Sequence, residues 1–179
     1  MKLQTFCEEA FEFRVLVDAC ATGHFIEVPN SPTISIVPGL PKTWKALLPT
    51  LRRVGEKFHL GLKVEDEWGN PTDQAEAEIH LKANLLVEGL PQIVPYERGM
   101  RGLTLENLKV TGSPGELRIT ASTKDGVVLA VSNPLTVSAV SRHASYWGDL
   151  HGQTGETCGI NTARSYFEFA RDLAFLDVS

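Results

Sequence analysis

The chain has 179 residues, of which 42% are hydrophobic and 22% are charged, and its formal net charge at pH 7 is -5. This length allows one large domain, or one domain with part of a second, and the hydrophobic share is typical of a packed globular protein. The acidic balance and the lack of a Lys/Arg cluster argue against a nucleic-acid-binding surface. No apolar run is long enough to span a membrane.

The N-terminal region and the cysteines predict the compartment. The first twenty residues contain no basic segment followed by an apolar core, so we expect no signal peptide and a cytoplasmic protein. The cysteines, Cys7, Cys20 and Cys158, lie far apart and lack the paired spacing of a zinc or redox motif. We therefore expect three reduced thiols.

The chain from about residue 11 to residue 140 alternates apolar and polar residues between Gly and Pro breaks. This period-two pattern predicts an antiparallel β-sandwich with almost no helix. The runs that carry it are 13–20, 34–36, 44–48, 58–64, 75–85, 117–121, 127–131 and 135–140. The turn Lys124-Asp125-Gly126 between two of these runs predicts a hairpin. The count, roughly seven to nine strands, is typical of an immunoglobulin-like sandwich. We assign residues 1–140 to this first domain.

The remaining residues, 141–179, show a different order of elements. Tyr146 to Leu150 form a short aromatic and apolar run, which predicts a buried strand. After a loop, a helix is expected from about Asn161 to Ala174, with Asn161 or Thr162 as its N-cap. A second strand pattern starts at Phe175, so the segment has the order of a parallel crossover unit. Because the sequence stops within this strand, we expect only the first unit of an α/β domain.

The residues that can carry chemistry gather at the end of the first strand of this unit. His151 and Gln153 follow the strand directly, and side chains two apart on a strand point to the same face. An imidazole and an amide carbonyl would then meet at one point, a candidate metal site. Glu156 lies in the loop that follows. Asp149 either orients the histidine or caps the strand edge.

These residues carry a resemblance to a known family. Asp149-Leu150-His151-Gly152-Gln153-Thr154 resembles the opening motif, Asp-Leu-His-x-His-(Ser/Thr), of the polymerase-and-histidinol-phosphatase (PHP) metallohydrolases. The wider sequence is similar to a large bacterial family of unknown function that attaches the α/β barrel of these hydrolases to an N-terminal β domain. The resemblance therefore implies that residues 141–179 are the start of a truncated PHP-like α/β barrel. The segments that carry this wider similarity are Trp147-Gly148, Tyr166-Phe167-x-Phe169-Ala170-Arg171-Asp172, Trp44, Arg53-x-Gly55-Glu56 and Trp68-Gly69-Asn70-Pro71.

The resemblance implies the N-terminal part of a metal-dependent hydrolase that acts on a phosphoester or another small molecule. A bound zinc, manganese or iron ion would activate water as the nucleophile, and His151 would be a ligand. The chain departs from the motif at Gln153, where the superfamily has its second histidine. An amide offers a metal only its carbonyl oxygen, so Gln153 is either a ligand or a hydrogen-bonding residue, and Glu156 would serve as a ligand or base.

The sequence is compatible with two functions. The first is the N-terminal portion of a PHP-like hydrolase, inactive by itself because it supplies too few ligands and holds little or no metal. The alternative is a non-catalytic β-sandwich that serves in binding or assembly. In either case, we expect the face of helix 162–174 that carries Tyr166, Phe167 and Ala170 to pack on the sandwich or on a second copy of the chain.

Overall fold

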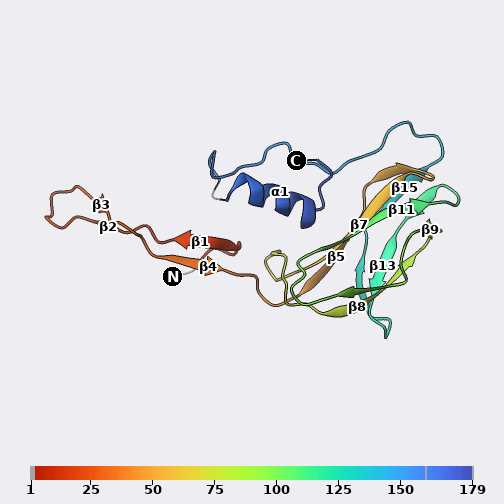
Figure 1. Ribbon diagram of the computed structural model, residues 1–179, viewed down its shortest axis with the longest axis horizontal. Helices are drawn as coiled ribbons and strands as arrows, with labels where there is room; N and C mark the ends of the chain where they lie inside the picture. The colour runs from red at the N-terminus through yellow and green to blue at the C-terminus, as the bar shows by residue number, and fades with distance from the viewer. Residues whose placement is uncertain (1–2, 160, 179) are drawn as a thin grey trace.

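The computed structural model describes residues 3–159 and 161–178. In these residues the fold is mainly β, with a single helix near the C-terminus (Figure 1). The elements are β1 (Glu8–Glu12), β2 (Leu16–Val17), β3 (Ile26–Glu27), β4 (Thr33–Ile36), β5 (Thr43–Leu47), β6 (Leu51–Arg53), β7 (Lys57–Glu65), β8 (Ala77–Ala83), β9 (Val87–Glu88), β10 (Ile93–Tyr96), β11 (Leu103–Val110), β12 (Gly115–Leu117), β13 (Ile119–Ser122), β14 (Val128–Val131), β15 (Leu135–Ser138) and α1 (Ala163–Asp172).

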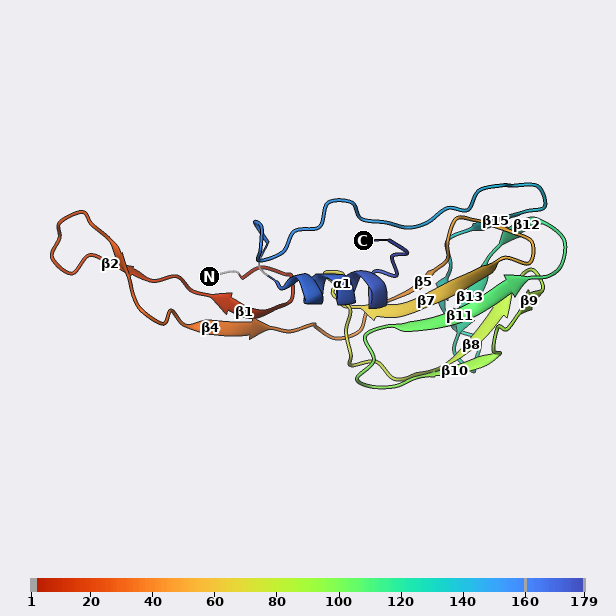
Figure 2. The ribbon, with the colours of Figure 1, turned by 45° about the horizontal axis from the view of Figure 1, so that its top comes forward.

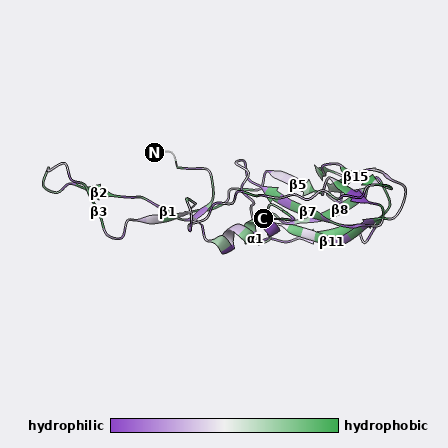
Figure 3. Ribbon diagram, turned by 90° about the horizontal axis from the view of Figure 1, so that it is seen from above, coloured by the Kyte–Doolittle hydropathy of each residue, from purple (hydrophilic) through white to green (hydrophobic). Residues whose placement is uncertain are grey.

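The strands from β5 to β15 form three sheets that enclose one core, an arrangement consistent with the predicted β-sandwich. Two sheets have four strands, in the orders β10-β8-β13-β14 and β5-β7-β11-β9, and the third has the order β12-β15-β6. The core takes side chains from all three sheets, and apolar segments run along their strands (Figure 3). The described helix, α1, is too short and too polar to cross a membrane.

The strand β7 shows why the sequence pattern predicts this part of the fold correctly. Its apolar residues alternate along the strand, so their side chains share one face. Phe58, Leu60, Leu62 and Val64 are each at most 4% exposed. Burying a side chain of this size contributes about 1.5–3 kcal/mol relative to leaving it in water. The predicted hairpin of β13 and β14 is also confirmed, because these strands pair antiparallel.

The first forty residues differ from the prediction. The runs 13–20 and 34–36 were expected to be sandwich strands, but in the structure they belong to an arm that projects from the sandwich (Figure 2). Among the described residues of this arm, β1 pairs with β4 alone and β2 pairs with β3 alone. Apolar side chains remain exposed there, among them Phe25 at 67% and Ile26 at 74%. Apolar and polar residues alternate in the same way in an isolated pair of strands and in a sheet that packs on a core. The sequence pattern therefore cannot distinguish the two.

A second difference concerns strand direction. The sequence predicted an antiparallel sandwich, but β6 and β15 pair parallel. Parallel neighbours need a long connection between them, and here almost the whole sandwich, from β7 to β14, lies between these two strands in the chain.

A buried carboxylate organises the turn after β7. Asp66, which is 3% exposed, accepts hydrogen bonds from the backbone amides of Trp68, Asn70 and Gly39, each at 2.9 Å. Asn70 in turn binds the segment that leads into β1, because its side chain donates a hydrogen bond to Thr5 O at 2.8 Å. Burial alone would raise the pKa of Asp66, but the hydrogen bonds outweigh it and lower the pKa to about 2.

Asp66 should make the fold sensitive to acid. Because the pKa of Asp66 in the folded chain lies below its ordinary value of 3.8, the charged carboxylate stabilises the fold above that pH. This contribution, about 2 kcal/mol, is lost as the pH falls from 3.8 toward 2. Asp66→Asn should therefore lower the free energy of unfolding at pH 7 and flatten its slope between pH 4 and 2. Urea unfolding at several pH values measures both effects.

The control for this experiment is Asp73→Asn, since Asp73 is exposed. Its unfolding curves should match those of the wild type at each pH. An Asp66→Asn variant that kept the wild-type acid dependence would show that other carboxylates control it.

The C-terminal segment has the predicted helix, but neither of the strands predicted on its two sides, from Tyr146 and from Phe175, forms within the described residues. Instead of a strand from Tyr146 to Leu150, the structure has one isolated parallel bridge between Gly148 and Val178. The helix covers Ala163–Asp172 rather than 161–174, and Thr162 is its N-cap, because its side chain accepts a hydrogen bond from Ser165 N. α1 lies between the arm and the sandwich (Figures 1 and 2).

Candidate functional site

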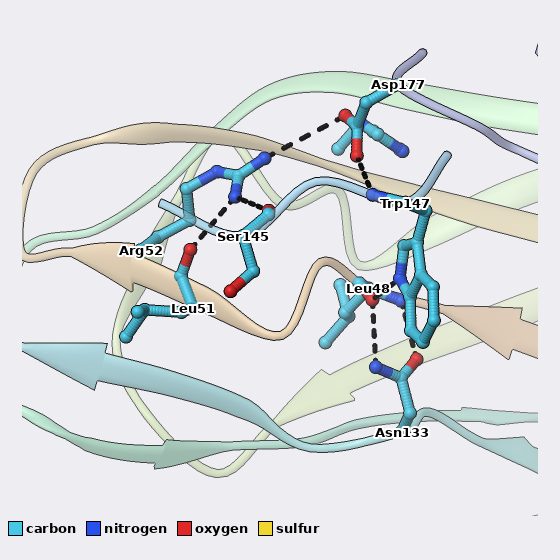
Figure 4. A network of polar contacts seen from close by, with 8 residues as sticks. Leu48, Leu51, Arg52, Asn133, Ser145, Trp147 and Asp177 are labelled. Atoms are coloured by element: carbon cyan, nitrogen blue, oxygen red, sulfur yellow. Dashed lines mark hydrogen bonds and ion pairs between the residues drawn. The ribbon is translucent and has the colours of Figure 1, made fainter. Parts of the chain in front are cut away.

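The segment that carries the candidate site is attached to the sandwich through Trp147 (Figure 4). The Trp147 indole donates to Leu48 O at 3.0 Å. The Asn133 side chain holds the same backbone unit, accepting from Leu48 N and donating to Leu48 O at 2.8 Å each. The backbone amide of Trp147 donates to the carboxylate of Asp177 at 2.8 Å. These bonds fix the start of the candidate strand against the sandwich.

A buried arginine, Arg52, forms the second attachment. Its side chain is 5% exposed and lies 3.8 Å from the carboxylate of Asp177. The guanidinium donates to Leu51 O at 2.9 Å and also to Ser145 O. It lies 4.8 Å from the centre of the Tyr146 ring, a distance at which a cation is attracted to the face of an aromatic ring. One sandwich side chain therefore contacts both ends of the C-terminal segment.

The third attachment is apolar. Phe175 is 2% exposed, and its ring covers Gly61 of β7 so closely that a Cβ on Gly61 would overlap it. A Cβ on Gly102 would lie 3.4 Å from the same ring and 2.6 Å from Asp172 O. Phe175 has φ 55°, a left-handed conformation that glycine usually supplies at the end of a helix. The fit of its ring between two glycines explains why a strained, bulky residue occupies this place.

A loop that carries His151 follows the bridge at Gly148. The carboxylate of Asp149 accepts from His151 N at 2.9 Å and from the Tyr166 hydroxyl at 3.0 Å. These two hydrogen bonds lower the pKa of Asp149. Tyr166 also covers Gly152, where a Cβ would overlap its ring. Asp149 thus holds the backbone of the loop and not the imidazole of His151.

The structure brings His151 and Gln153 together, but in a loop instead of at a strand end, and with the amide nitrogen in place of the expected carbonyl oxygen. Gln153 Nε2 lies 2.9 Å from His151 Nε2. The amide oxygen of Gln153 faces away from the histidine and accepts from the Thr157 hydroxyl at 3.0 Å and the Cys158 thiol at 2.8 Å. All four side chains are exposed to solvent in part or in full. The group in contact with the imidazole nitrogen Nε2 is therefore an N–H donor.

The side chains around His151 are not arranged to bind a metal ion in this structure. Glu156 makes one hydrogen bond near this loop, from its backbone amide to Thr154 Oγ1 at 3.3 Å, and none that joins its carboxylate to His151. Within residues 3–159 and 161–178, no three His, Cys, Asp or Glu side chains stand close enough to share an ion. A tight site needs three or four ligands held rigidly, and here His151 faces an amide nitrogen.

The structure also reveals residues that the sequence gave no reason to select. A pocket of about 420 Å³ opens where α1 and the segment after it meet β7 and β11. His59, Glu106 and Asp177 line it together with Arg171, and His59 Nδ1 lies 3.8 Å from the Asp177 carboxylate. Because these residues are up to 118 positions apart in the sequence, no local pattern connects them.

Comparisons with known proteins extend along nearly the whole chain. No family model matches it. It is similar to two curated relatives, each described as an uncharacterized protein, from Chlamydia trachomatis serovar D and Chlamydia muridarum, at 27% identity over 172 residues, 94% of the chain. The chain spans about a quarter of the length of these relatives, 27% of each. The arm, the sandwich and the C-terminal segment thus all fall in the region of similarity.

Proposed function

We propose that the chain is the N-terminal part of a PHP-like metal-dependent hydrolase that acts on a phosphoester or a similar small molecule. In this proposal an immunoglobulin-like sandwich carries the first strand, helix and strand start of an α/β barrel. His151 contributes one ligand for a zinc, manganese or iron ion, and further ligands come from strands that these 179 residues do not contain.

The observation that supports the proposal most is the position of His151. It follows a parallel bridge between Gly148 and Val178, and Val178 lies after α1 in the chain. Ligands in α/β barrels come from the carboxyl ends of parallel strands, and His151 comes three residues after this bridge, the place that such an end would occupy. The greater length of the curated relatives leaves room for further strands.

The same proposal predicts that the 179-residue chain is inactive by itself. One histidine held by an amide gives a divalent ion too few ligands, and catalysis also needs an open position for water. Purified chain should contain substoichiometric metal by inductively coupled plasma mass spectrometry and should leave p-nitrophenyl phosphate intact. His151→Ala should change neither result.

The opposite outcome is equally informative. Tightly bound metal with turnover that His151→Ala abolishes would contradict the prediction, and it would place the missing ligands on a second copy of the chain. His143→Ala is the matched control, because His143 is exposed and lies between β15 and Trp147.

The second candidate function is a non-catalytic binding or assembly module. It is supported by the arm, where apolar side chains such as Leu16, Phe25 and Ile26 are 47%, 67% and 74% exposed. In the helix, Phe167 and Phe169 are 50% and 45% exposed, so the proposal includes self-association through residues 162–174. Further His and Asp/Glu residues at strand ends in a reading frame that continues past Ser179 would favour the hydrolase over this module.

The proposal places the protein in the cytoplasm. All three cysteines are free in the structure, and Cys20 and Cys158 are exposed. Cysteines that form no disulfide are typical of a reducing compartment.

A further inference from the structure

We propose that Gln153 is not a metal ligand but a hydrogen-bond donor that occupies the lone pair of His151 Nε2. This inference rests on the proposed function, in which His151 is the ligand. The amide nitrogen of Gln153 lies 2.9 Å from His151 Nε2. An amide nitrogen can only donate a hydrogen bond. The imidazole nitrogen must then accept it, which requires neutral His151 with its proton on Nδ1.

The neighbours on the other side of the amide favour this orientation. Gln153 Oε1 lies 3.0 Å from the Thr157 hydroxyl and 2.8 Å from the Cys158 thiol. The Thr157 hydroxyl also lies 3.0 Å from Thr154 O, so its one proton has two acceptors and the thiol gives the stronger preference. A thiol is a weak donor and a still weaker partner for an N–H group, so the oxygen fits this side better than the nitrogen does. The loop that carries Thr157 and Cys158 therefore directs the amide nitrogen toward His151. A glutamine in this position cannot offer its oxygen to a metal on the histidine.

The contact makes Gln153 a competitor of the metal. A metal ion binds the same lone pair of Nε2 that accepts the amide hydrogen. Binding must therefore break the hydrogen bond between Gln153 and His151. A hydrogen bond of this kind changes an equilibrium by about two- to tenfold. In the second motif position of the PHP pattern, Gln153 would thus weaken the site instead of completing it.

The first test needs no metal. Two-bond nitrogen-15 and proton correlation spectra of the purified chain report which imidazole nitrogen carries the proton, and the His151→Ala spectrum assigns the His151 signals. We expect His151 to be protonated on Nδ1, and its Nε2 signal to shift in Gln153→Ala. A His151 ring protonated on Nε2 would overturn the inference, since the amide oxygen would then face the histidine.

The second test is a zinc titration of the same proteins by calorimetry. Gln153→Ala should bind Zn²⁺ about two- to tenfold more tightly than the wild type, because Nε2 is released. Gln153→His should bind more tightly still, since it adds a second imidazole. Weaker binding by Gln153→Ala than by the wild type would overturn the inference and identify the amide oxygen as a ligand.

The two tests separate this inference from the proposed function. If zinc binding is the same in every variant and survives His151→Ala, the proposed metal site fails, while the spectra still decide whether Gln153 donates to His151. Thr157→Val with Cys158→Ala checks the orientation. Without their donors the amide can rotate, so the shift of the His151 Nε2 signal should resemble that of Gln153→Ala. A wild-type signal in this double variant would contradict the role of the two neighbours.

Discussion

Replacing Arg52 by Ala is expected to lower the free energy of unfolding by about 3 kcal/mol, the largest effect that we predict. The substitution leaves the carboxylate of Asp177, whose side chain is 13% exposed, without its buried cation. It also removes the donor to Ser145 O and the cation over the Tyr146 ring. Urea unfolding measures the loss. Hydrogen exchange should show that residues 145–178 lose protection first.

Arg53→Ala is the matched control for Arg52→Ala. Arg53 is the next residue of β6, but it is exposed, and a surface substitution changes stability by about 0.5 kcal/mol at most. Arg52→Lys should recover only part of the loss, because an ammonium group lacks the planar fork that serves several acceptors. Equal stability of the Arg52→Ala and Arg53→Ala variants would mean that the buried pair does not hold the segment.

Gly61→Ala is expected to lower the free energy of unfolding by about 1–3 kcal/mol and to displace Phe175 from the sandwich. The new Cβ would occupy the space of the Phe175 ring. Phe175→Ala removes that ring, so adding Gly61→Ala to this variant should cost much less than it does in the wild type. Thermal unfolding of the two single variants and the double variant gives the coupling energy.

The control for Gly61→Ala is Gly115→Ala in β12. A Cβ there would lie 3.8 Å from its nearest neighbour, Leu85, which is an ordinary van der Waals contact. If the costs of Gly61→Ala and Phe175→Ala simply add, the ring and the glycine do not share the space that the structure assigns to them.

The parts of the fold that the sequence predicted correctly are those fixed by local periodicity. The alternation of Phe58, Leu60, Leu62 and Val64 is sufficient to define a half-buried strand. Similarly, the turn at 124–126 between two apolar runs is sufficient for a hairpin. Neither prediction needs a distant residue.

The arm and the attachment of the C-terminal segment depend on distant partners instead. Alternation around Leu16 is the same whether or not a sheet covers it. Arg52 and Arg53 are indistinguishable in the sequence, and only the fold buries the first of them. Phe175 contacts Gly61 although the two residues are 114 positions apart in the chain. No local sequence pattern predicts the positive φ of Phe175.

The candidate site falls between these cases. The sequence predicted His151 and Gln153 at a strand end with the amide carbonyl toward the imidazole, whereas the structure has them in contact in a loop through the amide nitrogen. The direction of the amide depends on Thr157 and Cys158, four and five positions after Gln153, in a loop without regular structure. Tyr166 was expected to pack but not to hold Asp149, because only the return of α1 toward the loop brings them together.

The most direct test of the proposed function is the metal content of the protein encoded by the complete reading frame. We predict a stoichiometric divalent metal ion and metal-dependent hydrolysis of a phosphoester, both lost in His151→Ala and both retained in His143→Ala. A complete protein without bound metal, or one in which metal and turnover survive His151→Ala, would contradict the account and leave the β-sandwich as a binding or assembly module.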